Sequence, residues 1–146
     1  MNPIYLDYNA TTPVDASVLE AMLPFLKGEF GNPSSGYALG RRAHAAIEQA
    51  RAEVADLIGA SGDEIVFTGG ATEASNLAIR GAVALGGKRT GVVTSNIEHP
   101  ATEACCALLR GAGHQMLRVP SAGDGRVAPE SLAAAIGEAT ALVTLI

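Results

Sequence analysis

The sequence lacks the features that mark several common classes of protein. Its 146 residues contain 10 Lys and Arg against 15 Asp and Glu, and the basic residues form no cluster. A net charge of −5 with that distribution argues against nucleic acid or an anionic membrane as a direct partner. No apolar run approaches the roughly 18 residues that a membrane-spanning helix needs. The first residues, MNPIYLDYNATTP, have neither the basic nor the apolar region of a signal peptide.

Cysteine is scarce as well. The two cysteines, Cys105 and Cys106, are adjacent and form no disulfide framework, which favours a reducing compartment. We therefore expect a soluble, cytoplasmic protein. No Cys-x-x-Cys or Cys–His spacing typical of zinc occurs, so the sequence predicts no metal site.

What the chain does contain is the pattern of an α/β domain. Apolar residues make up 48% of the sequence and charged residues 17%, which excludes a disordered segment. From Glu64 onward, short β-forming stretches alternate with stretches of helical spacing. The expected order is strand 64–68, helix 71–85, strand 91–95, helix 100–113, strand 115–120, helix 129–139 and strand 141–146. Short connections between these elements predict a parallel sheet flanked by helices, with all strand carboxyl ends at one edge.

The first part of the chain has a different organisation. We expect residues 1–60 to form an N-terminal segment of loops and two helices, and residues 61–146 to begin the α/β domain. Thr12 is the predicted N-cap of the first helix, and a long amphipathic helix follows the turn-rich loop 31–36. The last residues, TALVTLI, read as a strand that stops at Ile146 without a turn. We therefore expect the chain to be the N-terminal part of a longer protein.

The carboxyl edge of the sheet is the predicted ligand site, because ligands of open α/β sheets collect there. The segments expected at this edge are 68–76, 95–100 and 120–126. In the first, two glycines precede a helix whose first N–H groups, at Ala71 and Thr72, form an anion site suited to a phosphate. An ordinary glycine-rich turn with Thr72 as N-cap is an equally weighted alternative. The segment matches neither a nucleotide P-loop nor a dinucleotide-binding fingerprint.

The segment SNIEHPATEACC carries the other candidates for chemistry. Pro100 begins a helix and pushes His99 toward extended backbone, so the imidazole can project from the same edge as Thr72. A helix cap or a surface residue is the commoner role for such a histidine. Cys105 lies on another helical face, and Cys106 lies about 10 Å along the axis from His99, too far for a nucleophile–base pair. Both cysteines are therefore expected to pack the helix on the sheet.

Four stretches, taken together, resemble a known family. YLDYNATTPVD, GNPSSGYALGRRA, EIVFTGGATEASNLAIRG and TSNIEHPA are similar to the N-terminal portion of cysteine desulfurases, which are pyridoxal-phosphate (PLP) enzymes of the class V aminotransferases. The resemblance implies the large α/β domain of PLP-dependent transferases of fold type I. It implies that Ala71 and Thr72 bind the cofactor phosphate and that His99 stacks on the pyridine ring and takes part in catalysis. Asn32 and Thr11 are weaker candidates near the active site or the dimer contact.

The implied reaction converts L-cysteine to L-alanine, with the sulfur passing to an enzyme cysteine as a persulfide and then to an acceptor protein. A homodimer is implied as well. Neither Lys27 nor Lys88 matches the family's cofactor-binding lysine, and neither cysteine matches the persulfide cysteine. We therefore expect the 146 residues alone to be inactive. The resemblance leaves open iron–sulfur cluster assembly, tRNA thiolation or DNA sulfur modification. Selenocysteine lyase, another class V aminotransferase, or a non-catalytic interaction module remain as alternatives.

Overall fold

The computed structural model describes residues 3–146, which divide into two compact units, one up to Val66 and one from Phe67 to Ile146. The first unit contains the helices α1 (Ala16–Lys27) and α2 (Ala38–Ile58) and the short 3-10 helix η1 (Gly62–Glu64). Within the described residues, no helix of either unit is both long and apolar enough to cross a membrane.

Helix α1 begins later than its sequence suggests. Asp15 is its N-cap, and one oxygen of the Asp15 carboxylate accepts a hydrogen bond of 2.8 Å from the backbone N–H of Ser17. The prediction of Thr12 as N-cap was wrong. The helix begins at Ala16, so Asp15, three residues after Thr12, stands where a side chain can accept from the first-turn amide.

The loop before α2 packs tightly on the first turn of that helix. Gly40 is buried there, and a Cβ built on it would lie 2.4 Å from the carbonyl oxygen of Ser35 and 2.5 Å from that of Asn32. A Cβ on Gly31 would lie 2.8 Å from the carbonyl carbon of Leu39. These two glycines therefore allow the loop to approach the helix backbone directly.

Residues 64–68 do not form the predicted strand. Ile65 has extended backbone dihedrals, but no strand among the described residues pairs with this segment. Val66 is 65% exposed and Phe67 48% exposed, so the segment is not buried as expected. A run of β-forming residues becomes a strand only when a neighbour completes its backbone hydrogen bonds.

The second unit is a parallel sheet with helices on both faces. Its strands are β1 (Gly91–Ser95), β2 (Met116–Val119) and β3 (Thr140–Thr144), in the order β2-β1-β3, and both pairings are parallel. Its helices are α3 (Ala71–Leu85), α4 (Pro100–Gly111) and α5 (Pro129–Ala135). The predicted parallel sheet flanked by helices is confirmed, with three strands in place of four.

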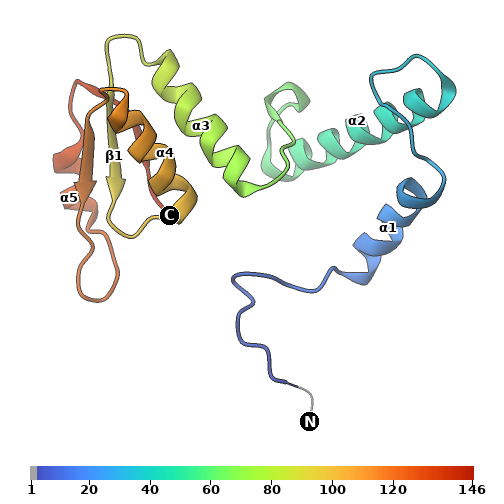
Figure 1. Ribbon diagram of the computed structural model, residues 1–146, viewed down its shortest axis with the longest axis horizontal. Coiled ribbons are helices and arrows are strands. Elements are labelled where there is room, and N and C mark those ends of the chain that lie inside the picture. The colour runs from blue at the N-terminus through green and yellow to red at the C-terminus, as the bar shows by residue number, and fades with distance from the viewer. Residues whose placement is uncertain (1–2) are drawn as a thin grey trace. The chain divides into compact units, whose positions relative to one another are not determined.

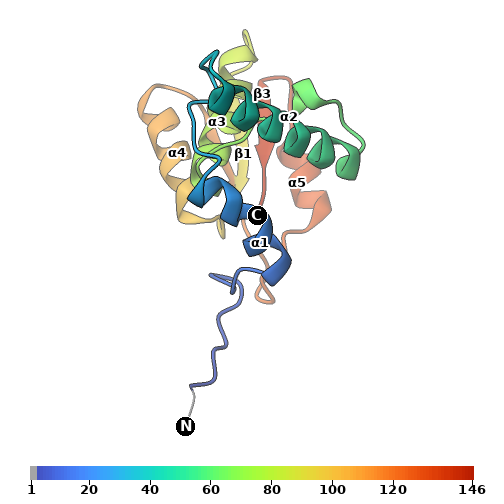
Figure 2. The same cartoon turned by 90° about the vertical axis from the view of Figure 1, so that its right-hand side faces the viewer.

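The strand order explains the placement of the helices. The chain moves from β1 outward to β2 through α4, then back past β1 to β3 through α5. Because both crossovers are right-handed by rule, moves in opposite directions put their helices on opposite faces. Figures 1 and 2 show α4 and α5 on opposite sides of β1. Helix α3 packs beside α4.

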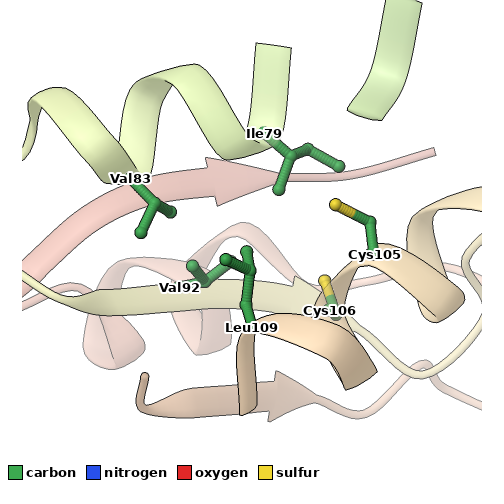
Figure 3. Packing of buried hydrophobic residues seen from close by; sticks show 6 residues of the cluster. All are labelled: Ile79, Val83, Val92, Cys105, Cys106 and Leu109. Carbon is green, nitrogen blue, oxygen red and sulfur yellow. The ribbon is translucent and has the colours of Figure 1, made fainter. Parts of the chain in front are cut away.

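The core of this unit lies between β1 and the pair α3 and α4. Figure 3 shows the six buried residues of the cluster, which are Ile79, Val83, Val92, Cys105, Cys106 and Leu109. Cys105 is 2% exposed and Cys106 is 1% exposed. The prediction that the two cysteines pack the helix on the sheet is therefore confirmed.

Candidate functional site

A cavity of about 310 Å³ lies at the carboxyl edge of the sheet of the second unit. Three parts of the chain line it: the start of α3, the loop after β1 with the start of α4, and the end of β3. The lining residues are Ala71, Thr72, Ser75, Glu98, His99, Ala101, Thr102, Thr144, Leu145 and Ile146. The strand order reverses at β1, which is where ligands of open α/β sheets bind.

Helix α3 contributes a set of N–H donors at its first turn. Its N-cap is Gly70, which has no side chain to cap these amides. The Oε2 atom of Glu73 instead accepts from the N–H of Gly69 at 2.7 Å, and the Thr68 hydroxyl donates to the Gly70 carbonyl at 3.1 Å. These two bonds hold the turn while the amides of Ala71 and Thr72 face outward from the helix start. The alternative of Thr72 as N-cap is wrong, because Thr72 is the second residue of the helix.

Thr72 is exposed on the cavity wall. Within residues 3–146 its hydroxyl makes no side-chain hydrogen bond, and only its carbonyl is engaged, by the Asn76 side-chain amide at 2.9 Å. The hydroxyl and the two helix amides therefore form a donor set that suits a phosphate group.

His99 lies across the same cavity and is the N-cap of α4. The backbone N–H of Ala101 donates to Nδ1 of His99 at 3.1 Å, and Pro100 occupies the first helical turn. In a neutral imidazole whose Nδ1 is an acceptor, the ring proton is on Nε2. The histidine is thus both a cap and a residue of the cavity wall, two roles that the sequence presented as alternatives.

The cysteines take no part in this site. Burial raises the pKa of the Cys105 thiol, with a small opposing effect from the charge of Arg80. Burial also raises the pKa of the Cys106 thiol. A thiol that is buried and held in its protonated form is a poor nucleophile.

The structure brings together two of the three segments expected at the sheet edge. Residues 120–126 follow β2 at this edge but do not line the cavity. The N–H of Ser121 donates instead to Oδ1 of Asn96 at 2.8 Å, which ties this segment to the loop after β1.

Sequence reasoning missed several residues of the cavity wall. Ser75 and Thr102 each lie about one turn into a helix whose start was already a candidate, so helical spacing could have indicated them. Glu98 directly precedes His99, but its partner, the backbone N–H of Ile146, lies just beyond β3 and 48 residues further along the chain.

The donor set and the cavity fit pyridoxal phosphate. The volume of about 310 Å³ is within the range of small-molecule sites, roughly 300–1,000 Å³. The glycine turn and Thr72 offer phosphate donors at one end, and His99 offers a flat ring for an aromatic group. None of the described residues that line this cavity is a lysine; Lys88 lies in the turn before β1, at the opposite edge of the sheet.

Comparison with known proteins decides the family. Residues 4–146 match the family described as Aminotransferase class-V. The chain belongs to this family.

This class V aminotransferase chain is 46% identical to a cysteine desulfurase IscS of Dictyoglomus turgidum, over 97% of the chain and 36% of that relative. A solved structure described as a NifS-like protein superposes with a TM-score of 0.90 at 37% identity, covering 97% of this chain and 39% of the other. SspA in complex with cysteine superposes with a TM-score of 0.88 at 38% identity, covering 97% and 41%. The resemblance to cysteine desulfurases is therefore confirmed, and the chain spans 36–41% of the length of these relatives.

Proposed function

We propose that this chain forms the phosphate-binding wall of a PLP-dependent cysteine desulfurase. The observation that carries the proposal is that Thr72 and His99, from separate helices, line one cavity at the carboxyl edge of the sheet. The many cysteine desulfurase relatives at 43–48% identity support it, as does the cysteine present in the SspA structure.

Each residue of the wall has a stated role in this proposal. The backbone N–H groups of Ala71 and Thr72, with the Thr72 hydroxyl, bind the phosphate through charge-assisted hydrogen bonds. His99 stacks its imidazole on the pyridine ring and holds a proton on Nε2, since Nδ1 accepts from Ala101. When bound, PLP supplies an electron sink for chemistry at the substrate's amino-acid centre.

The further parts of the proposal concern the whole protein. The substrate is L-cysteine, the products are L-alanine and a sulfur atom carried on an enzyme cysteine, and a sulfur-acceptor protein receives that sulfur. Iron–sulfur cluster assembly is the acceptor pathway that the IscS names support. The protein acts as a cytoplasmic homodimer.

Phosphate binding can be tested by comparing PLP with pyridoxal, which lacks the phosphate. Thr72→Ala should weaken PLP binding in equilibrium dialysis, since it removes one hydrogen bond to a charged group. Such a bond contributes about 1.5–3 kcal/mol, or about 10- to 100-fold in affinity. Thr72→Ser, which keeps the hydroxyl, should bind PLP nearly as the parent chain does.

Pyridoxal affinity should be the same in the parent chain and in Thr72→Ala. A matched control is Thr90→Ala, because Thr90 is exposed and precedes β1 at the opposite edge of the sheet. Equal losses of PLP and pyridoxal in Thr72→Ala would contradict the phosphate assignment. Unchanged PLP binding in that variant would contradict it as well.

A further inference from the structure

Glu98, a residue of the cavity wall, connects the end of β1 to the chain that follows β3. Its Oε1 atom accepts a hydrogen bond from the hydroxyl of Ser95, the last residue of β1, and another of 3.1 Å from the backbone N–H of Ile146, just beyond β3. Ser95 is 1% exposed and also accepts from the N–H of Ile97 at 3.2 Å. One carboxylate oxygen therefore joins the centre of the sheet to the chain that follows its outer strand.

The loop between β1 and α4 is held on both sides by such bonds. On the β2 side, the N–H of Asn96 donates to the carbonyl of Val119 at 3.2 Å. On the β3 side, beyond the last paired residues Thr94 and Thr144, the Glu98 carboxylate accepts from the N–H of Ile146. His99 comes next in the chain, with extended backbone dihedrals of φ −61° and ψ 144° that start α4. The direction of its imidazole depends on where this loop is fixed.

We propose that Glu98 is a positioning residue, whose carboxylate fixes the loop against β3 and so sets the orientation of the His99 imidazole in the cavity. The inference rests on the proposed function in assigning His99 to the cofactor site. The tie itself is a property of the apo chain and can be measured without cofactor.

The geometry indicates which side chains can replace Glu98. The amide oxygen of Gln has the same reach and accepts from both the Ser95 hydroxyl and the Ile146 N–H. Ala accepts from neither. Asp keeps the charge but its carboxylate is drawn back by one bond, about 1.5 Å, and cannot reach both donors. Gln should therefore preserve the function of Glu98, while Ala and Asp should lose it.

The test uses two readouts on the full chain. The first is the pair of ring-nitrogen shifts of His99 in long-range ¹H–¹⁵N spectra, which report the tautomer and therefore the Ala101 hydrogen bond to Nδ1. The second is amide hydrogen exchange at Ile146. In Glu98→Ala we expect Ile146 to exchange about tenfold faster or more, the effect of losing one hydrogen bond to a charged group. The two ring nitrogens of His99 should become more alike, as the two tautomers mix.

Glu98→Gln should match the parent chain in both readouts. Glu98→Asp should resemble Glu98→Ala, so the aspartate variant can replace the alanine variant in the test if the latter does not fold. Glu138→Ala is the control, because Glu138 is an exposed glutamate between α5 and β3. Faster exchange at Ile146 with unchanged His99 shifts would overturn the proposal, since Glu98 would then hold β3 alone. Parent-like behaviour of both Ala and Asp would overturn it too.

The same variants separate this inference from the proposed function. If Thr72→Ala fails to weaken PLP binding, the phosphate assignment falls, but the His99 shifts and the Ile146 exchange still decide the role of Glu98. In PLP dialysis, Glu98→Ala should retain the difference in affinity between PLP and pyridoxal, because Glu98 makes none of the proposed phosphate contacts.

Discussion

Replacing Gly40 by alanine should destabilise the loop 31–36 and the start of α2. The new Cβ would lie 2.4 Å from the Ser35 carbonyl oxygen, which is about 0.9 Å closer than the roughly 3.3 Å at which a carbon and a carbonyl oxygen normally meet. The Asn32 carbonyl, at 2.5 Å, blocks the same position. Both obstacles are backbone atoms, so no side-chain rotation can relieve the overlap.

The size of the effect follows from two opposing contributions. Overpacking of this kind costs about 1–3 kcal/mol, and the better helix propensity of alanine returns up to about 1 kcal/mol. We therefore expect a net loss of about 1–2 kcal/mol in the free energy of unfolding. With a slope of about 2 kcal/mol per molar urea, the midpoint should fall by about 0.5–1 M.

Urea titration followed by far-ultraviolet circular dichroism measures this change. Gly36→Ala is the matched control, because a Cβ at Gly36 in the same loop meets no atom within 4 Å. It should leave the midpoint unchanged or raise it slightly, since alanine reduces the entropy of the unfolded chain. An unchanged midpoint in Gly40→Ala, or an equal fall in both variants, would refute the reasoning.

Two further predictions concern titratable groups. Because burial raises the pKa of Cys105 and Cys106, both thiols should resist a disulfide reagent in the native chain and react fully in denaturant. As the pH rises, the thiols of the unfolded chain lose their protons before those of the folded chain. The free energy of unfolding should therefore fall as the pH rises through about 8.5. A urea midpoint that stays level up to about pH 10 would contradict this. Hydrogen bonds from the side chain and then the backbone of Ser17 lower the pKa of Asp15, so its contribution to α1 is present above about pH 4 and is lost as the pH falls further. The protection of the first-turn amides of α1 from hydrogen exchange, relative to the intrinsic rate at each pH, should fall on acidification in the parent chain but not in Asp15→Asn. An equal fall in both would exclude Asp15 as the cause.

Much of the second unit could be predicted because its signals are local. Pro100 and Pro129 each stand at the start of a helix, and the centre of β1 is a run of β-branched residues, Val92 to Thr94. Once the alternation of strand and helix is recognised, the parallel sheet and its functional edge follow from general rules. Thr72 and His99 could be placed on one edge for this reason.

The sequence-based predictions were wrong or incomplete mainly where the structure depends on residues far away in the sequence. Residues 64–68 have the composition of a strand, but a strand requires a neighbour that the local sequence does not specify. The role of Glu98 depends on the Ile146 amide, 48 residues further along the chain. The start of α1 was misplaced for a different reason: Thr12 and Asp15 are both good caps, and only the backbone path decides between them.

The position of β3 in the sheet also has a consequence for the order of folding. β3 pairs with the edge of β1 that β2 leaves free, and β1 is further from β3 than from β2 in the sequence, so the contact of β1 with β3 should form more slowly than that with β2. The cavity takes one of its walls from Thr144–Ile146, so it is absent from any folding intermediate in which β3 is unpaired. Ligand binding at this edge should therefore report the last step of assembly, after the core around Cys105 and Cys106 has formed.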